Sequence, residues 1–420
     1  MGLEHGKRNR SLIYAAASLR SAATGLTGVL AGIYLARIHL SAGEIGAIIT
    51  AGLAGGAVAA LLATVAADNL GRRRFLFAVA LLSALGGFVL AAGTSTILLG
   101  GAAFFGMLNG MGKDRGAAVA IEQAILPSTA PDERRTSVFA FYSVLQSACA
   151  AAGALMAGLP DLMHRFEPAM PEASALRIMI VVYAAMMGAA AILYLGLTQD
   201  VEIYSPPVGM RVSPQTRDTL VKLSALFALD SLGGGFLTQA LISLFFVERF
   251  GVSAGAVAAL FFCASIANAL SQLVAPLLAR RIGLINTMVF THLPSNVLLM
   301  LVAIAPNFPL AAALFLVRES MVQMDVPARQ SYVMAVVQPQ ERTFAAGVTG
   351  LVRLGGWAVA PGLAGVMMQG VSLGAPLIVG PALKAVYDVL LFRSFRHLKP
   401  PEEKAREATV SKEPARKAQS

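Results

Sequence analysis

Five ionisable side chains fall near the middle of long apolar stretches of the chain: Arg20, Asp230, Arg318, Glu319 and Arg353. With a helical rise of 1.5 Å per residue, each would lie about 14–16 Å deep in a hydrocarbon layer about 30 Å thick. An ionised group at that depth costs about 2.5–3.5 kcal/mol or more unless it is paired or wetted. We therefore predict that these residues gather around one polar cavity, with Asn109 and Gln239 as polar neighbours.

The composition is typical of an integral membrane protein. Of the 420 residues, 56% are hydrophobic and 13% are charged, whereas soluble domains average about 25% charged residues. The apolar runs are continuous rather than alternating, which indicates helices whose backbone polar groups are satisfied internally. At about 20–22 residues per crossing, twelve crossings would use roughly 250 residues. We predict an all-α fold with about twelve transmembrane helices.

Lys and Arg residues are concentrated in every second gap between the predicted crossings. The predicted crossings cover residues 11–36, 45–67, 75–95, 97–118, 137–159, 175–197, 219–247, 254–278, 284–305, 308–328, 344–369 and 373–392. One set of gaps contains most of the Lys and Arg residues, among them Lys7, Arg72–Arg74 and Arg134–Arg135. Because positive residues stay on the cytoplasmic side, we predict a multi-pass protein of the plasma (inner) membrane with both termini in the cytoplasm.

The two halves of the sequence repeat one another. Leu40-Ser41-Ala42-Gly43 is matched by Val252-Ser253-Ala254-Gly255, and Pro131–Arg134 is matched by Pro339–Arg342, in the same order. Parallel repeats of this kind build two pseudo-symmetric bundles. We predict a six-helix bundle over residues 1–197, a cytoplasmic linker over 198–218, a second six-helix bundle over 219–393, and a disordered basic tail over 394–420.

The short turn between the second and third crossings carries a motif. Asp68-Asn69-Leu70-Gly71-Arg72-Arg73-Arg74 resembles the signature of the major facilitator superfamily of secondary transporters, approximately G-x-x-x-D-[RK]-x-G-[RK]-[RK]. Asp68, Gly71, Arg72 and Arg73 match it, whereas Asn69 replaces a basic residue and Thr64 replaces the leading glycine. The resemblance implies that Asp68 accepts hydrogen bonds from a neighbouring helix N-terminus at the cytoplasmic face. It also implies that the arginines contact the adjoining half and lipid headgroups.

The resemblance implies that the first and seventh crossings face one another across a central cavity, with the fourth and tenth beside them. Arg20 and Asp230 hold equivalent places in the two halves, so we predict that Asp230 contacts either Arg20 or Arg318. Such a contact could be a static ion pair that locks the halves together. It could instead be a site whose protonation or pairing changes between inward and outward states, which we favour because buried ion pairs are poor stabilisers.

A second group of charges is predicted near the cytoplasmic ends of the helices. Lys113, Asp114 and Arg115 would lie about 24 Å down the fourth crossing, and Asp325 about 26 Å down the tenth. Arg329 follows Asp325 by one turn. Together with Asp68, Gly71, Arg72 and Arg73 they form the predicted cytoplasmic gate, although they could instead take a proton or substrate. Glu122, where the fourth helix continues into the loop that follows, is predicted to be a solvated or capping residue rather than a proton carrier.

Other chemistry finds little support in the sequence. The five histidines are scattered without ligand spacing, both cysteines lie in apolar stretches, and no G-x-x-x-x-G-K-[ST] loop is present. These patterns argue against a metal site, a disulfide and direct use of ATP, so we expect neither a cofactor nor enzymatic activity. The net charge of +10 is explained by topology and the tail, and we expect no nucleic-acid partner.

The resemblance implies a secondary active transporter that moves a small solute by alternating access as a monomer. We expect proton coupling, and we prefer efflux to uptake. Three arginines and two acids at mid-depth favour an anionic substrate, while cations and drug-like compounds remain open. A passive facilitator or uptake permease, and a membrane-embedded sensor or enzyme, are the alternative functions.

Overall fold

The computed structural model describes residues 3–131, 134–202, 214–324, 329 and 342–395, and within these ranges the regular structure is helical. The first half contains α1 (Leu3–Arg37), α2 (Ala42–Leu70), α3 (Arg72–Ala92), α4 (Thr96–Gly106), α5 (Ala117–Ile125), η1 (Leu126–Thr129), α6 (Arg135–Met156), α7 (Leu159–Phe166) and α8 (Glu172–Leu195). The remainder contains η3 (Gln199–Val201), α9 (Pro214–Gly235), α10 (Gln239–Phe250), α11 (Ala254–Ile282), α12 (Leu284–Ala303), α13 (Phe308–Val322), α15 (Arg342–Gly370) and α16 (Pro376–Phe395).

The helices account for the predicted crossings. In the described part of the chain, nine helical segments are long and apolar enough to span a membrane. Two of them combine successive helices, α6 with α7 and α9 with α10. The other three predicted crossings contain α4 with α5, α13, and α16. The predicted all-α membrane fold with two bundles is therefore confirmed.

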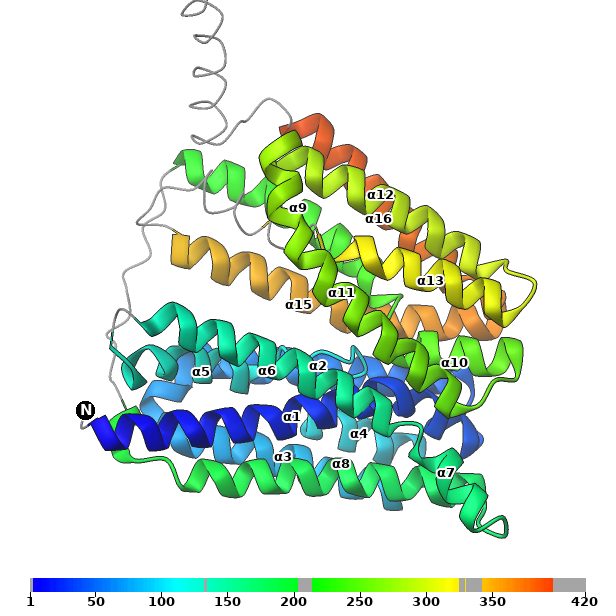
Figure 1. The fold of residues 1–420 in the computed structure, drawn as a ribbon, viewed down its shortest axis with the longest axis horizontal. Coiled ribbons are helices and arrows are strands. Elements are labelled where there is room, and N and C mark those ends of the chain that lie inside the picture. The colour runs from blue at the N-terminus through cyan, green and yellow to red at the C-terminus, as the bar shows by residue number, and fades with distance from the viewer. Residues whose placement is uncertain (1–2, 132–133, 203–213, 325–328, 330–341, 396–420) are drawn as a thin grey trace, which may run out of the picture.

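The two bundles lie against each other as layers (Figure 1). In the first bundle α1 packs on α6 and α8, and α3 packs on α8; in the second, α9 packs on α15 and α16, and α12 packs on α13 and α16. The bundles are joined mainly by α2 with α15, α1 with α10, and α6 with α11. A Cβ at Gly46 of α2 would lie 2.4 Å from the carbonyl oxygen of Pro361, so only glycine permits this approach.

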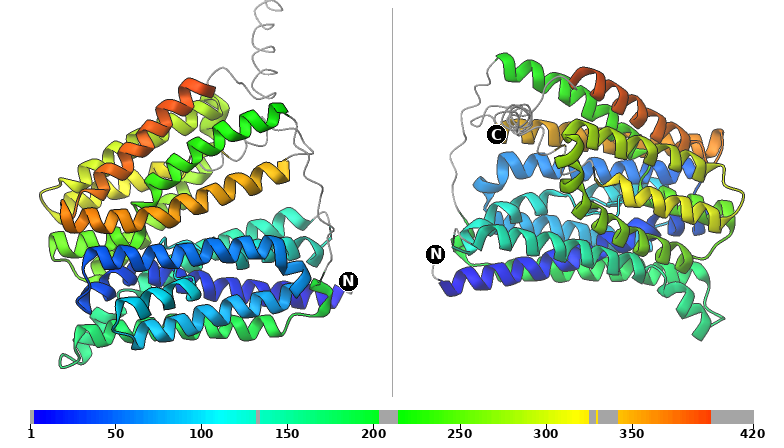
Figure 2. Two further views of the ribbon diagram at one scale, coloured as in Figure 1. Left: turned by 180° about the vertical axis from the view of Figure 1, so that it is seen from behind. Right: turned by 45° about the horizontal axis from the view of Figure 1, so that its top comes forward.

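The two ends of the assembly differ in how the bundles meet. We name the end that carries Lys7, Arg72 and Arg134 the basic end, and the end that carries Arg37 the opposite end. Towards the opposite end, one hydrophobic core contains residues of both bundles, such as Leu30 of α1 with Phe246 of α10. At the basic end each bundle has a core of its own. The bundles thus share a core towards the opposite end and have separate cores at the basic end. In the left view of Figure 2, the ribbons of the two bundles diverge towards the end that carries the N-terminus.

Some predicted boundaries fall outside the described residues. Residues 203–213 of the predicted linker, residues 396–420 of the predicted tail and the gate residue Asp325 are among them. The division of the chain at 197–198, 218–219 and 393–394 remains a prediction.

Candidate functional site

The fourth crossing is interrupted in its middle. α4 ends at Gly106, Met107 takes a left-handed conformation with φ 52° and ψ 43°, and the helix resumes as α5 at Ala117. Asn109 holds the intervening turn, since its Nδ2 donates to the carbonyl of Lys113 at 2.8 Å and its Oδ1 accepts from the amide of Met111 at 2.9 Å. The prediction of one helix over 97–118 is wrong, because four glycines and an asparagine favour a turn here.

This turn carries Asp114 to Arg20, at the midpoint of α1. Nη2 and Nε of Arg20 donate to Oδ2 of Asp114 at 2.9 and 3.1 Å. The second oxygen of Asp114 accepts from the amide of Gly116 at 3.3 Å. The predicted depth of Asp114 near the cytoplasmic surface is therefore wrong, because counting 1.5 Å per residue fails where the chain leaves the helix.

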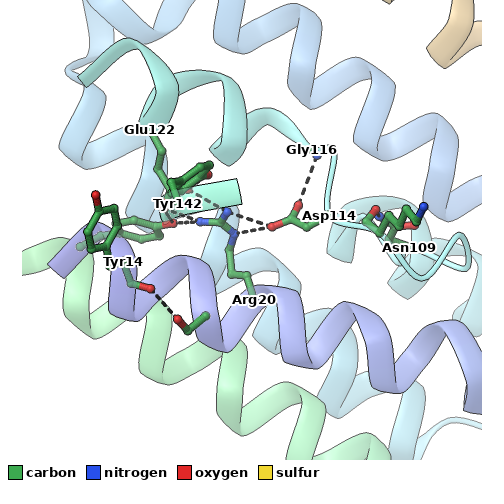
Figure 3. A network of polar contacts seen from close by, with 10 residues as sticks. Tyr14, Arg20, Asn109, Asp114, Gly116, Glu122 and Tyr142 are labelled. Atoms are coloured by element: carbon green, nitrogen blue, oxygen red, sulfur yellow. Dashed lines mark hydrogen bonds and ion pairs between the residues drawn. The ribbon is translucent and has the colours of Figure 1, made fainter. Parts of the chain in front are cut away.

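Glu122 of α5 is the second carboxylate on Arg20 (Figure 3). Nη1 and Nη2 of Arg20 donate to its two oxygens at 2.7 and 2.9 Å. The hydroxyls of Tyr142 and Tyr194 donate to the same carboxylate, each at 2.6 Å, and Arg20 also contacts Tyr194. Glu122 is fully buried, so the prediction that it is a solvated or capping residue is wrong. The sequence analysis missed both tyrosines, which pattern alone does not distinguish from lipid-facing aromatics.

Asp230 belongs to a different cluster, which lies entirely in the second bundle. Its carboxylate pairs with Lys384 of α16, with Arg329 at 3.5 Å and with Arg353 at 3.8 Å. The predicted contact of Asp230 with Arg20 is wrong, because each of these two charges is paired within its own bundle. The alternative contact with Arg318 is wrong as well, because Arg318 pairs with Glu319 on α13. Arg329, predicted for the gate, lies in this cluster instead.

Three further polar residues extend the second cluster. Nδ1 of His292 in α12 lies 2.9 Å from Asp388 in α16, and Nδ2 of Asn296 donates to the same carboxylate at 3.1 Å. His292, Asn296 and Asp388 are all buried. The sequence analysis missed them together with Lys384, although two charged residues inside the last predicted crossing, Lys384 and Asp388, were the available signal.

Arg318 and Glu319 form a third, smaller group on α13. Arg318 contacts the adjacent Glu319, whose other oxygen accepts from Nδ2 of Asn268 at 2.6 Å. Both charged residues are buried. The five mid-depth charges are thus divided among three groups rather than gathered in one.

A cavity of about 100 Å³ opens beside the interrupted helix. Of the predicted cavity residues, Arg20 and Asn109 line it, while Asp230, Gln239, Arg318, Glu319 and Arg353 are not among the lining residues. The predicted gate residues Lys113, Asp114 and Arg115 line it as well, together with apolar side chains and Tyr183. From the second bundle come Leu354 and Trp357, so the cavity lies between the bundles.

Trp357 connects the cavity to the charges of both bundles. The guanidinium carbons of Arg115 and Arg353 lie 4.8 and 4.9 Å from the centre of its ring, which is the range of a cation–π contact. Nearby, the amide of Ala240 at the start of α10 donates to the carbonyl of Gly110 at 3.1 Å. The interrupted segment of the first bundle therefore abuts the α9–α10 break of the second.

The remaining gate residues lie at the basic end. Nε of Arg72 donates to Asp68 at 2.7 Å, and the carboxylate of Glu202 accepts from the amides of Arg72 and Arg73 at 2.6 and 3.1 Å. Gly71 joins α2 to α3 with φ 92°, a conformation that favours glycine. Glu202, not Asp68, accepts from the backbone amides at the start of α3. Asp68 accepts from the side chain of Arg72, the first residue of α3, and no bond from Asp68 to a backbone amide of a helix N-terminus is found among the described residues.

Comparisons with known proteins agree with this architecture. The family model described as Major Facilitator Superfamily matches residues 13–318 and 223–419, and the chain belongs to that superfamily. The uncharacterized membrane protein YJR124C of Saccharomyces cerevisiae is 24% identical over 417 residues, covering 91% of this chain and 93% of the relative.

Two solved structures are similar in fold. The nucleoside transporter NupG superposes with a TM-score of 0.72 at 13% identity, covering 94% of this chain and 99% of the other. A bacterial homologue of the human lysosomal transporter Spinster, in an inward-facing and occupied conformation, superposes with a TM-score of 0.68 at 14% identity, covering 92% and 96%. The chain is therefore a membrane transport protein of the superfamily, and these low identities describe its fold alone.

Proposed function

We propose that the protein is a proton-coupled secondary transporter that exports a small organic anion, or a drug-like compound with an anionic group, across the plasma membrane by alternating access. The basic end is cytoplasmic in this proposal, in accord with the distribution of Lys and Arg. The observation that carries the proposal is the cavity between the bundles, which is lined by the ion pair of Arg20 and Asp114 and by the ring of Trp357.

The lining of the cavity suits an anion with an apolar part. Arg20, Lys113 and Arg115 provide three positive charges, and Asp114 is the lining carboxylate. With the buried Glu122 included, these five groups carry a net charge of +1 when all are ionised. Trp357, Tyr183 and the apolar lining offer contact area for the uncharged part of a solute.

Asp114 is the group that we assign to proton coupling. Its side chain is 11% exposed, whereas that of Glu122 is 0% exposed and is bound by Arg20 and two tyrosines. A proton that arrives through the cavity therefore meets Asp114 first. Neutralising Asp114 weakens its bond to Arg20 and releases the interrupted segment that abuts the second bundle.

The packing of the two ends supports alternation. The shared core joins the bundles towards the opposite end, while separate cores leave them independent at the basic end. This is the arrangement of an inward-open state. A solute or a proton shifts the balance between states only by its differential affinity for them.

Proton flux into vesicles tests the proposal. The purified chain is reconstituted in vesicles that contain a pH-sensitive dye, and a panel of small organic anions is added with and without an imposed pH gradient. We expect at least one anion to move protons, and Asp114→Asn to abolish that flux while solute exchange continues. Glu172→Gln removes an exposed carboxylate at the opposite end and should leave the flux unchanged.

The same experiment separates the rival function. If the Arg20–Asp114 pair is a static lock, solute equilibrates at equal rates with and without the gradient, and Asp114→Asn changes neither rate. That result would identify a passive facilitator and would remove proton coupling from the account.

A further inference from the structure

A second cavity lies at the basic end, away from the cavity between the bundles. It has a volume of about 300 Å³ and lies where the start of α1 meets the start of α6. Its lining residues are Lys7, Arg10, Tyr14, Thr129, Pro131, Arg134, Ser137, Val138 and Phe141. All of them belong to the first bundle, and the transport proposal uses none of them.

The mouth of this cavity is positively charged. Lys7, Arg10 and Arg134 line it, and no described carboxylate does. Nη1 of Arg10 donates to the carbonyl of Thr129 at 3.2 Å, which fixes this side chain over the cavity. Lys7 and Arg134 are exposed, and each has an ammonium or guanidinium group available to an anion that enters.

The inner wall of the cavity is aromatic. The hydroxyl of Tyr14 donates to the carbonyl of Val138 at 3.1 Å, which ties α1 to α6. The ring of Tyr14 lies 5.0 Å from that of Phe141. Phe141 is 55% exposed, and Val144, nearly one turn further along α6, is 66% exposed. An apolar strip on the outer surface of α6 therefore begins at the edge of the charged mouth.

We propose that this cavity binds the phosphate group of an anionic phospholipid. Basic pockets between membrane helices are suited to lipid headgroups, and the neighbouring strip of Phe141 and Val144 is suited to an acyl chain. A soluble phosphate compound shares the headgroup chemistry but has no acyl chain to pack against the strip. The proposal does not depend on the transport function, since it concerns a different surface.

Lipid selectivity in vesicles tests this proposal. The full chain is reconstituted in phosphatidylcholine vesicles that contain spin-labelled phosphatidylglycerol, and the motionally restricted fraction is measured. The double variant Lys7→Gln/Arg134→Gln should weaken the preference for phosphatidylglycerol by roughly thirtyfold. This factor corresponds to a binding free energy of about 1 kcal/mol for each cation removed. Both side chains are exposed, so the variant should fold, and an unchanged unfolding midpoint verifies this.

The matched control removes two exposed cations elsewhere at the basic end of the molecule. The side chains of Arg217 and Lys222 are both exposed, and Arg217→Gln/Lys222→Gln changes the net charge equally and should keep the preference for phosphatidylglycerol. Equal losses in the two double variants would overturn the proposal, because general surface charge would then explain the selectivity. An unchanged preference in Lys7→Gln/Arg134→Gln would also overturn it.

A competition arm distinguishes the two sources of phosphate. Inorganic phosphate at millimolar concentration should not displace the labelled lipid from the wild-type chain, and displacement would overturn the assignment to lipid. The sequence carries Asp132 and Glu133 between the lining residues Pro131 and Arg134, and both lie outside the described residues. If these carboxylates neutralised the three cations, no preference for phosphatidylglycerol would be observed in the wild type, which would likewise refute the proposal.

Discussion

Replacing Arg20 by methionine tests how the buried cluster contributes to stability. Arg20 is 4% exposed and pairs with Asp114 and Glu122. Methionine keeps most of the apolar stem but leaves two carboxylates without their cation. Breaking a buried ion pair by removing one partner costs about 3–5 kcal/mol. We expect Arg20→Met to lower the free energy of unfolding by that amount.

The same helix supplies a matched control. Arg37 of α1 also faces two carboxylates, Glu172 at 3.0 Å and Glu248 at 3.7 Å, but its side chain is 37% exposed. Exposed ion pairs contribute about 0–1 kcal/mol, so Arg37→Met should cost no more than that. The two variants remove the same residue type from the same helix and differ mainly in burial.

Unfolding titrations in mixed micelles, followed by circular dichroism, measure both free energies. Adding Glu122→Gln to Arg20→Met removes one of the stranded charges and should recover about 1–3 kcal/mol. Equal losses in Arg20→Met and Arg37→Met would refute the reasoning, because burial would then have no energetic consequence. A double variant that is less stable than Arg20→Met would refute the assigned pairing.

Three further changes probe other contacts by the same titrations. Gly112 has φ 72°, and a Cβ there would lie 1.4 Å from Oε1 of Gln239. We expect Gly112→Ala to lower the free energy of unfolding by about 2–4 kcal/mol, and Gln239→Ala to restore part of that loss. An unchanged free energy of unfolding in Gly112→Ala would disprove the close approach. Asp388→Ala removes the carboxylate that lies within hydrogen-bond distance of His292, and it should lower the free energy of unfolding by about 1–3 kcal/mol. No loss would show that this hydrogen bond is dispensable. Glu202→Gln weakens the capping of α3 and should cost about 0.5–1 kcal/mol at low salt, and a loss that does not shrink in high salt would contradict the electrostatic origin.

The fold could be predicted because its cause is local. Long apolar runs, the alternation of basic gaps and the repeated landmarks each follow from the bilayer acting on a short segment. The motif in the turn at Asp68–Arg74 indicated the family. None of these signals depends on which helices touch.

The site could be predicted only in part, because it depends on contacts between distant segments. Depth along a helix correctly indicated that Arg20 and Asp230 are buried, but not which partners they have. The break at Gly106–Gly116 changed the depth of Asp114 and brought Glu122 into the cluster. The glycines and Asn109 were the visible signal for that break, and hydropathy concealed it because the flanking residues remain apolar.

Two spin-label distances, one measured across the bundles at each end of the molecule, test the central claim of proton-coupled alternation most directly. One pair is placed at the basic end on the exposed Leu70 and Val221, and another at the opposite end on the exposed Ile97 and Val371, with the native cysteines replaced. On acidification in vesicles, the account predicts that the first pair approaches while the second separates, and that Asp114→Asn no longer responds to pH. If both distance distributions in the wild type stay unchanged between neutral and acidic pH, the account is contradicted.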